Sequence, residues 1–147
     1  MAAVTAAMVK ELREISGAGM MECKKALTET DGNLDAAIEF LRKNGQAKVE
    51  KKANRIAAEG LTAVGVVDDH TAAVVEVNSE TDFVAQNEKF KAFVSAVAAQ
   101  AAATSSTDID AFMAEKWNAD SSKTVKEALA DITLVISEKL DIRRFEK

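Results

Sequence analysis

The spacing of the apolar residues changes at Gly60, and this change limits the folds open to the chain. Before Gly60, apolar side chains recur every three or four positions, as on one face of a helix. After it, Val-rich runs at 61–67 and 72–78 flank the short polar segment 68–71, which predicts a β-hairpin. Helical spacing returns after Asn87. The pattern predicts an α+β fold, in which a small antiparallel sheet is packed by helices.

The composition is that of a folded, soluble domain. The chain has 147 residues, of which 48% are hydrophobic and 29% charged, and this excludes a disordered tail. The single Cys23 excludes a disulfide framework and a Cys-x-x-Cys site. No apolar run approaches the roughly 20 residues of a membrane span, and no signal peptide is visible in the N-terminal segment Met1–Thr5. We therefore expect a cytoplasmic protein without a membrane partner.

Residues 1–45 predict a bundle of three short helices. Thr5 is expected to cap the first helix, because its hydroxyl can accept a hydrogen bond from a first-turn N–H. The second is expected over Met20–Thr28, and Asn33 is expected to cap the third, which Gly45 would stop. The expected inward positions are Val4, Met8, Leu12 and Ile15, then Cys23, Ala26 and Leu27, then Leu34, Ala37, Ile38 and Leu41.

Residues 46–60 predict a basic helical linker. Five basic residues stand against one acidic residue, Glu50, between positions 43 and 55: Lys43, Lys48, Lys51, Lys52 and Arg55. Such a cluster can bind phosphates, but this one has no aromatic residue to stack on bases, and the whole chain carries a net charge of −5. We expect a solvated helix and no direct contact with nucleic acid.

Residues 61–147 predict an α+β core subdomain. On the second strand, Val75 and Val77 share one face. Asn87 is expected to cap a long helix with inward residues Phe90, Phe93, Val94, Val97 and Ala101. Thr107 and Asp110 have capping-box spacing before another short helix. The last helix is expected near 124–138, with Val125, Leu129, Ile132 and Ile136 inward, and a strand is expected to begin at Ile142.

The sequence offers almost nothing for enzymatic chemistry. His70 is the only histidine, and it lies in the hairpin turn without a spaced nucleophile or second ligand. Cys23 is expected in the core as a small hydrophobic residue. The chain has no glycine-rich phosphate loop and no cluster of metal ligands. We expect a protein that is not an enzyme and has no catalytic residues, cofactor or metal.

Two apolar features have both a structural and a functional interpretation. Met20 and Met21 are adjacent at a helix start, so they point in different directions, and an exposed Met is typical of adaptable binding surfaces. Thr81-Asp82-Phe83-Val84 occupies the corner between a strand and a helix, where an exposed Phe beside a carboxylate would make a protruding contact. Core packing remains the alternative for both features.

These residues carry a resemblance to a known family. The segments Thr5–Arg13 and Gly17–Leu27 resemble the start of bacterial elongation factor Ts. Lys51-Lys52-Ala53 and Ala57–Gly60 are similar to that family's linker. Glu76-Val77-Asn78, followed by Thr81–Ala85, resembles its signature, and Ile142-Arg143-Arg144 closes the match. The resemblance therefore covers the whole chain.

The resemblance implies a guanine-nucleotide exchange factor for elongation factor Tu, with an N-terminal module like ubiquitin-associated domains. Asp82 and Phe83, within the motif Thr81–Val84, would intrude beside the magnesium site of the GTPase, and Mg²⁺ and then GDP would leave. Docking would be supplied by Arg13, Met20, Met21 and Lys24 of the module, and by Ile136 and Ser137 of the core.

The chain also departs from the family pattern. Gln86 stands where the family usually has Lys or Arg, and Ser137-Glu138-Lys139-Leu140 replaces a Gly-Glu-Asn-Ile type of motif. The family continues into a second core subdomain, which we expect to be absent here. The alternative function is a ubiquitin-associated-type protein-binding module without exchange activity.

Overall fold

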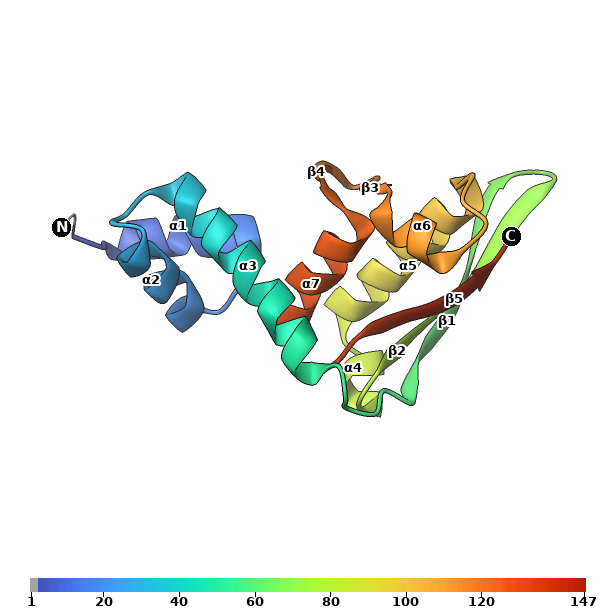
Figure 1. Ribbon diagram of the computed structural model, residues 1–147, viewed down its shortest axis with the longest axis horizontal. Coiled ribbons are helices and arrows are strands. Elements are labelled where there is room, and N and C mark those ends of the chain that lie inside the picture. Colours follow the sequence, from blue (N-terminus) through green and yellow to red (C-terminus); the bar gives the residue numbers. More distant parts are fainter. Residues whose placement is uncertain (1–2) are drawn as a thin grey trace.

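Helices precede and flank a small sheet in the computed structural model, which describes residues 3–147 (Figure 1). The predicted α+β class is confirmed. The first two residues of the N-terminal segment, in which no signal peptide was visible, lie outside the described residues. The elements in chain order are α1 (Ala6–Ser16), α2 (Met20–Glu29), α3 (Leu34–Lys52), β1 (Glu59–Asp68), β2 (Thr71–Ser79), α4 (Asp82–Ala85), α5 (Glu88–Ala103), α6 (Ile109–Ala114), β3 (Lys116–Trp117), β4 (Asp120–Thr124), α7 (Val125–Ile136) and β5 (Asp141–Glu146).

The main sheet has three antiparallel strands in the order β1-β2-β5, so the predicted hairpin and the predicted last strand pair on β2. Val75 and Val77 of β2 are buried beneath α5, as the alternation predicts. Gly65 of β1 allows a close approach to that helix. A Cβ atom there would lie 2.0 Å from the Ala98 carbonyl oxygen, so no larger residue fits without a backbone shift.

Helix α5 supplies the centre of the core around this sheet. Its predicted inward residues are all buried: Phe90, Phe93, Val94, Val97 and Ala101. The expected cap at Thr107 is wrong by one position, because Asp108 accepts the hydrogen bond from the Ala111 N–H at 2.8 Å. The two-stranded sheet β3-β4 was not predicted, since its short strands are mostly polar and show no alternation.

The three N-terminal helices form a second core together with Leu134 of α7, and both predicted caps are confirmed. Thr5 Oγ1 accepts from the Met8 N–H at 3.2 Å, and Asn33 Oδ1 accepts from the Ala36 N–H at 2.9 Å. Cys23 is fully buried, as expected. Ile15 is not an inward residue, because it lies in the last turn of α1 and is 55% exposed.

Gly45 does not stop the third helix. Helix α3 continues through it to Lys52, so the boundary expected at residue 45 falls inside a helix. Gly45 serves instead for close packing, because a Cβ atom there would lie 2.8 Å from the Ala130 carbonyl oxygen of α7. The basic segment is also partly paired. Lys48 Nζ donates to Glu22 Oε1 at 3.0 Å, and Arg55 donates to Glu80 Oε1 at 3.2 Å.

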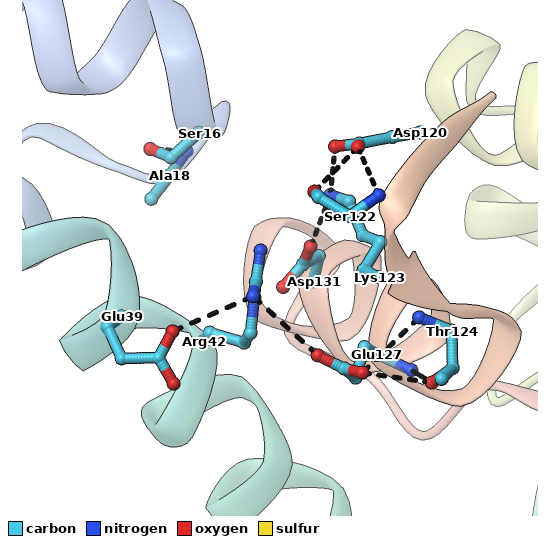
Figure 2. Close-up of polar contacts among 10 residues, drawn as sticks. All are labelled: Ser16, Ala18, Glu39, Arg42, Asp120, Ser122, Lys123, Thr124, Glu127 and Asp131. Atoms are coloured by element: carbon cyan, nitrogen blue, oxygen red, sulfur yellow. Dashed lines mark hydrogen bonds and ion pairs between the residues drawn. The ribbon is translucent and has the colours of Figure 1, made fainter. Parts of the chain in front are cut away.

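Polar contacts join α3 to the core along α7 (Figure 2). The Arg42 guanidinium lies 3.6 Å from a Glu39 carboxylate oxygen and 3.7 Å from a Glu127 oxygen. Glu127 also completes the capping box of α7 with Thr124. The Arg42–Glu127 pair therefore links the first half of α3 to the start of α7. Within residues 3–147, no helix combines the length and apolar character needed to cross a bilayer.

Candidate partner-binding surface

The signature motif forms α4, a single helical turn at the end of β2. Thr81 is its N-cap and has an extended backbone, and its hydroxyl accepts from the Val84 N–H at 3.3 Å. The Gln86 N–H closes the turn on the carbonyl oxygens of Asp82 and Phe83, at 3.3 and 3.1 Å. The Ser79 hydroxyl donates to the Thr81 carbonyl at 2.9 Å. The corner is therefore a hydrogen-bonded turn of fixed shape.

Side chains on this turn have opposite environments. Ala85 is buried, and Val84 packs on the main core. Phe83 is 84% exposed, and Asp82 beside it is exposed as well. We call these two residues the α4 tip. The core-packing interpretation is thus wrong for Phe83, while Val84 serves as an anchor beneath the tip.

Two carboxylates hold the base of α4 to the loop after α7. Glu138 Oε1 accepts from the backbone N–H groups of Glu80 and Thr81 at 3.1 and 3.0 Å. Its other oxygen, Oε2, accepts from the Thr81 hydroxyl at 2.7 Å. Glu80 Oε1 in turn accepts from the Lys139 N–H at 2.6 Å. This hydrogen bond, with the Arg55 side chain adding to it, lowers the pKa of Glu80 below its ordinary value.

Sequence reasoning missed both carboxylates. Glu138 stands in the segment compared with the family's Gly-Glu-Asn-Ile motif, and Glu80 immediately precedes the signature. These were the available signals, but the two positions are far apart in the sequence. Only the pairing of β5 with β2 brings the loop after α7 beside the end of β2.

The residues expected to dock from the N-terminal module are exposed. Met20 and Met21, at the start of α2, are 59% and 76% exposed, so neither fills the core. Arg13 of α1 and Lys24 of α2 are exposed as well. In Figure 1, α2 begins on the lower side of the view, where α4 also lies, and α3 runs between the two regions.

Ile136 and Ser137 lie at the end of α7, close in sequence to Glu138. Ile136 is partly buried and packs on the main core. Ser137 is exposed and takes the left-handed conformation, with φ 66°, that ends the helix. The structure thus joins Ser137 to the α4 tip through Glu138. It places the two Met residues at the start of α2, in the N-terminal bundle.

Groups with chemical reactivity are few in the described chain. His70 is exposed in the turn between β1 and β2, and Cys23 is fully buried. Among residues 3–147, no group of three or more His, Cys, Asp or Glu is placed to hold a metal ion. The most prominent feature of the α4 corner is therefore an exposed apolar contact, not a reactive group.

Comparison with known proteins identifies the family to which the chain is similar. Residues 80–147 match the model of the family described as Elongation factor TS. Elongation factor Ts of Clostridium novyi (strain NT) is 53% identical over 145 residues, which are 98% of this chain and 47% of that protein. The protein of the same name from Hydrogenovibrio crunogenus is 55% identical, over 98% of this chain and 49% of its own length. The relative from Rhodopseudomonas palustris (strain TIE-1) is 54% identical, with 98% and 45% covered.

The chain spans about half the length of the curated relatives it matches. A match over 98% of the chain leaves out only a few residues, so it includes the motif of α4. The resemblance to elongation factor Ts, predicted from the sequence motifs, is confirmed along nearly the whole chain.

Proposed function

We propose that the chain is a guanine-nucleotide exchange factor, which binds elongation factor Tu in the cytoplasm and promotes GDP release during translation elongation. The observation that carries the proposal is the α4 tip, an 84% exposed Phe83 beside an exposed Asp82 on a turn of fixed shape. The match to elongation factor Ts supports it. Neither a cofactor nor a catalytic side chain of this chain takes part.

In this mechanism the tip acts by displacing parts of the GTPase. Phe83 enters between two helices of the partner, where burying its ring provides free energy for the displacement. Asp82 comes beside the magnesium site, where its carboxylate disturbs the groups that surround the ion. Mg²⁺ neutralises phosphate charge in such sites, so disturbing its coordination weakens the hold on GDP. The effect is reciprocal, because GDP weakens binding of the factor by the same free energy.

The remaining contacts hold the factor in place while the tip acts. Arg13, Met20, Met21 and Lys24 dock the N-terminal module on the GTPase domain, and they present two apolar and two cationic side chains. Ile136 and Ser137 support the contact from the core. Thr81 and Val84 act indirectly, since Thr81 caps α4 and Val84 anchors it on the core.

The second candidate is a ubiquitin-associated-type binding module without exchange activity. The exposed Met20 and Met21 suit such a module, but it has no use for the α4 tip. The two functions therefore differ in whether the core subdomain is needed. Neither of them requires contact with nucleic acid or a membrane.

Release of a fluorescent GDP analogue from elongation factor Tu distinguishes the two. The chain should accelerate release in a concentration-dependent manner, and excess unlabelled GDP prevents rebinding. Binding to elongation factor Tu without any acceleration would overturn the exchange function and favour the binding module.

A further inference from the structure

We propose that Glu138 is a positioning residue for the α4 tip: its carboxylate fixes the direction in which Phe83 and Asp82 project. The inference rests on the proposed exchange function and adds a residue to it. Glu138 is partly buried and is not itself expected to contact the partner.

The first argument is the number of hydrogen bonds that one carboxylate makes to one corner. Glu138 accepts from the Glu80 and Thr81 N–H groups through one oxygen and from the Thr81 hydroxyl through the other. A carboxylate that accepts three donors on adjacent residues restrains both position and orientation, as a single hydrogen bond does not. Thr81 is also the N-cap of α4, so the restraint acts directly on the start of the helix.

The second argument is that α4 cannot fix itself. A four-residue helix has almost no stability of its own, because the first turn of a helix costs more conformational freedom than its hydrogen bonds return. Of its four residues, Val84 and Ala85 are turned toward the core, while Asp82 and Phe83 are exposed. The capping hydroxyl of Thr81 has a single hydrogen to donate, and Glu138 receives it.

The third argument is that the restraint extends to the end of α3. Glu80 accepts from the Lys139 N–H and pairs with Arg55, so the two loops hold each other reciprocally. Lys139 Nζ donates to the carbonyl oxygens of Ala53 and Arg55 at 2.8 and 3.0 Å. These contacts fix α4 relative to the helix that carries the N-terminal module. Glu138 therefore helps to set the position of the α4 tip relative to the docking residues of the N-terminal module.

The test compares Glu138→Ala and Glu138→Gln with the unchanged chain over a range of concentrations. A misdirected tip lowers the maximal rate of GDP release, whereas a lost docking contact raises the half-saturating concentration. We expect Glu138→Ala to lower the maximal rate about tenfold, equivalent to about 1.4 kcal/mol, with the half-saturating concentration nearly unchanged. Glu138→Gln keeps an oxygen for both N–H groups and should restore most of the rate.

Asp108→Ala is the matched control, because it too removes a carboxylate that accepts a backbone N–H at the start of a short helix, in this case as the N-cap of α6. It should lower the melting temperature and leave the maximal release rate unchanged. An unchanged maximal rate in Glu138→Ala would overturn the inference. So would an equal loss of rate in Asp108→Ala, because the effect would then be one of general stability.

Amide hydrogen exchange tests the positioning independently of the proposed function. Glu138→Ala should speed exchange at Glu80 and Thr81, and also at Val84 and Ala85 within α4, while Val77 of β2 stays protected. Faster exchange confined to Glu80 and Thr81 would overturn the inference, because α4 would then hold without Glu138. If the unchanged chain does not accelerate GDP release, the exchange function fails, and the amide measurement still decides whether Glu138 fixes α4.

Discussion

Phe83 and Ala85 stand two positions apart in one helical turn, yet Phe83 is 84% exposed and Ala85 is 5% exposed. Successive residues of a helix are rotated by about 100°, so two positions bring a side chain almost to the opposite face. The small residue faces inward and the aromatic residue faces solvent. This inverts the usual preference, and it supports a binding role for the ring.

Replacing Phe83 by Ala should impair exchange without harming the fold. Loss of an aromatic anchor costs on the order of 2 kcal/mol at a hot spot, which is about a thirtyfold loss of exchange efficiency. The melting temperature of the Phe83→Ala variant should barely change, because the exposed ring makes few contacts in the folded chain. Phe90→Ala is the control, since Phe90 is fully buried and its truncation should cost about 3–5 kcal/mol of stability. Unchanged exchange together with a large loss of stability in Phe83→Ala would contradict a binding role for the ring.

Met20→Ala and Met21→Ala should weaken docking while leaving the maximal rate of release intact. Each exposed Met is expected to contribute about 1 kcal/mol, so the half-saturating concentration should rise about fivefold. Leu27→Ala, in the same helix but fully buried, should instead destabilise the module by about 2–5 kcal/mol. Titrations of GDP release and melting curves measure both effects. Docking would be excluded if the Met variants bound normally.

The Glu80 carboxylate should make part of the stability depend on pH. The Lys139 N–H holds its folded pKa below the ordinary value of 4.5, with the Arg55 side chain adding to the effect. A lowered folded pKa stabilises the protein above the unfolded pKa, and this contribution is lost as pH falls through the folded value. Glu80→Gln should therefore melt lower than the unchanged chain at neutral pH, and the gap should close in acid. Melting curves at several pH values test this, and a constant gap would speak against it.

Gly45→Ala should destabilise the chain even though Ala is the better helix former. Helix propensity alone favours Ala by about 1 kcal/mol. The new Cβ atom would lie 2.8 Å from the Ala130 carbonyl oxygen, so α3 and α7 must separate, at a net cost of about 1–3 kcal/mol. Gln46→Ala, at the next and exposed position, is the control and should be nearly neutral. Denaturant unfolding measures both, and a more stable Gly45→Ala variant would mean that the helices are not in close contact.

Ser137→Gly should stabilise the chain. The residue has φ 66°, a conformation that costs an L-residue about 1–2 kcal/mol and costs Gly almost nothing. Part of that gain is offset by the greater freedom of Gly in the unfolded chain, so we expect about 0.5–1 kcal/mol. Ser137→Ala provides the comparison at the same position and should be the less stable of the two by thermal melting. Equal stability of the Gly and Ala variants would show that the left-handed turn is not maintained.

The sequence predicted the parts of the fold that depend on local pattern. Local pattern was enough to predict the hairpin and the caps at Thr5, Asn33 and Asn87, because each depends on residues within a few positions of one another. Gly45 was misread, since a glycine that ends a helix and a glycine that admits a neighbouring helix look alike in sequence. Only the contact with Ala130 separates the two roles.

In the candidate site, too, the local motif could be predicted from the sequence, and the features that depend on distant contacts could not. The motif at Thr81–Val84 could be recognised, but the exposure of Phe83 could not be predicted, because a strand-to-helix corner is compatible with a buried or an exposed ring. Glu138 could not be predicted for another reason: its donors at Glu80 and Thr81 lie 58 and 57 positions away in the sequence. Hydrogen bonds between distant loops leave no periodic signal in a single sequence.

Helix α3 runs without a break from the N-terminal bundle to Lys52, close to the Arg55–Glu80 contact at the base of α4. This continuity has a consequence for avidity. A flexible tether would let a second contact search a volume, and its effective concentration would fall as the tether lengthened. A helix fixed by Arg42 and Gly45 sets one span instead. In the proposed complex, Phe83 can meet only a surface at that span once Met20 and Met21 have bound, so the distance between the two contacts would itself select the partner.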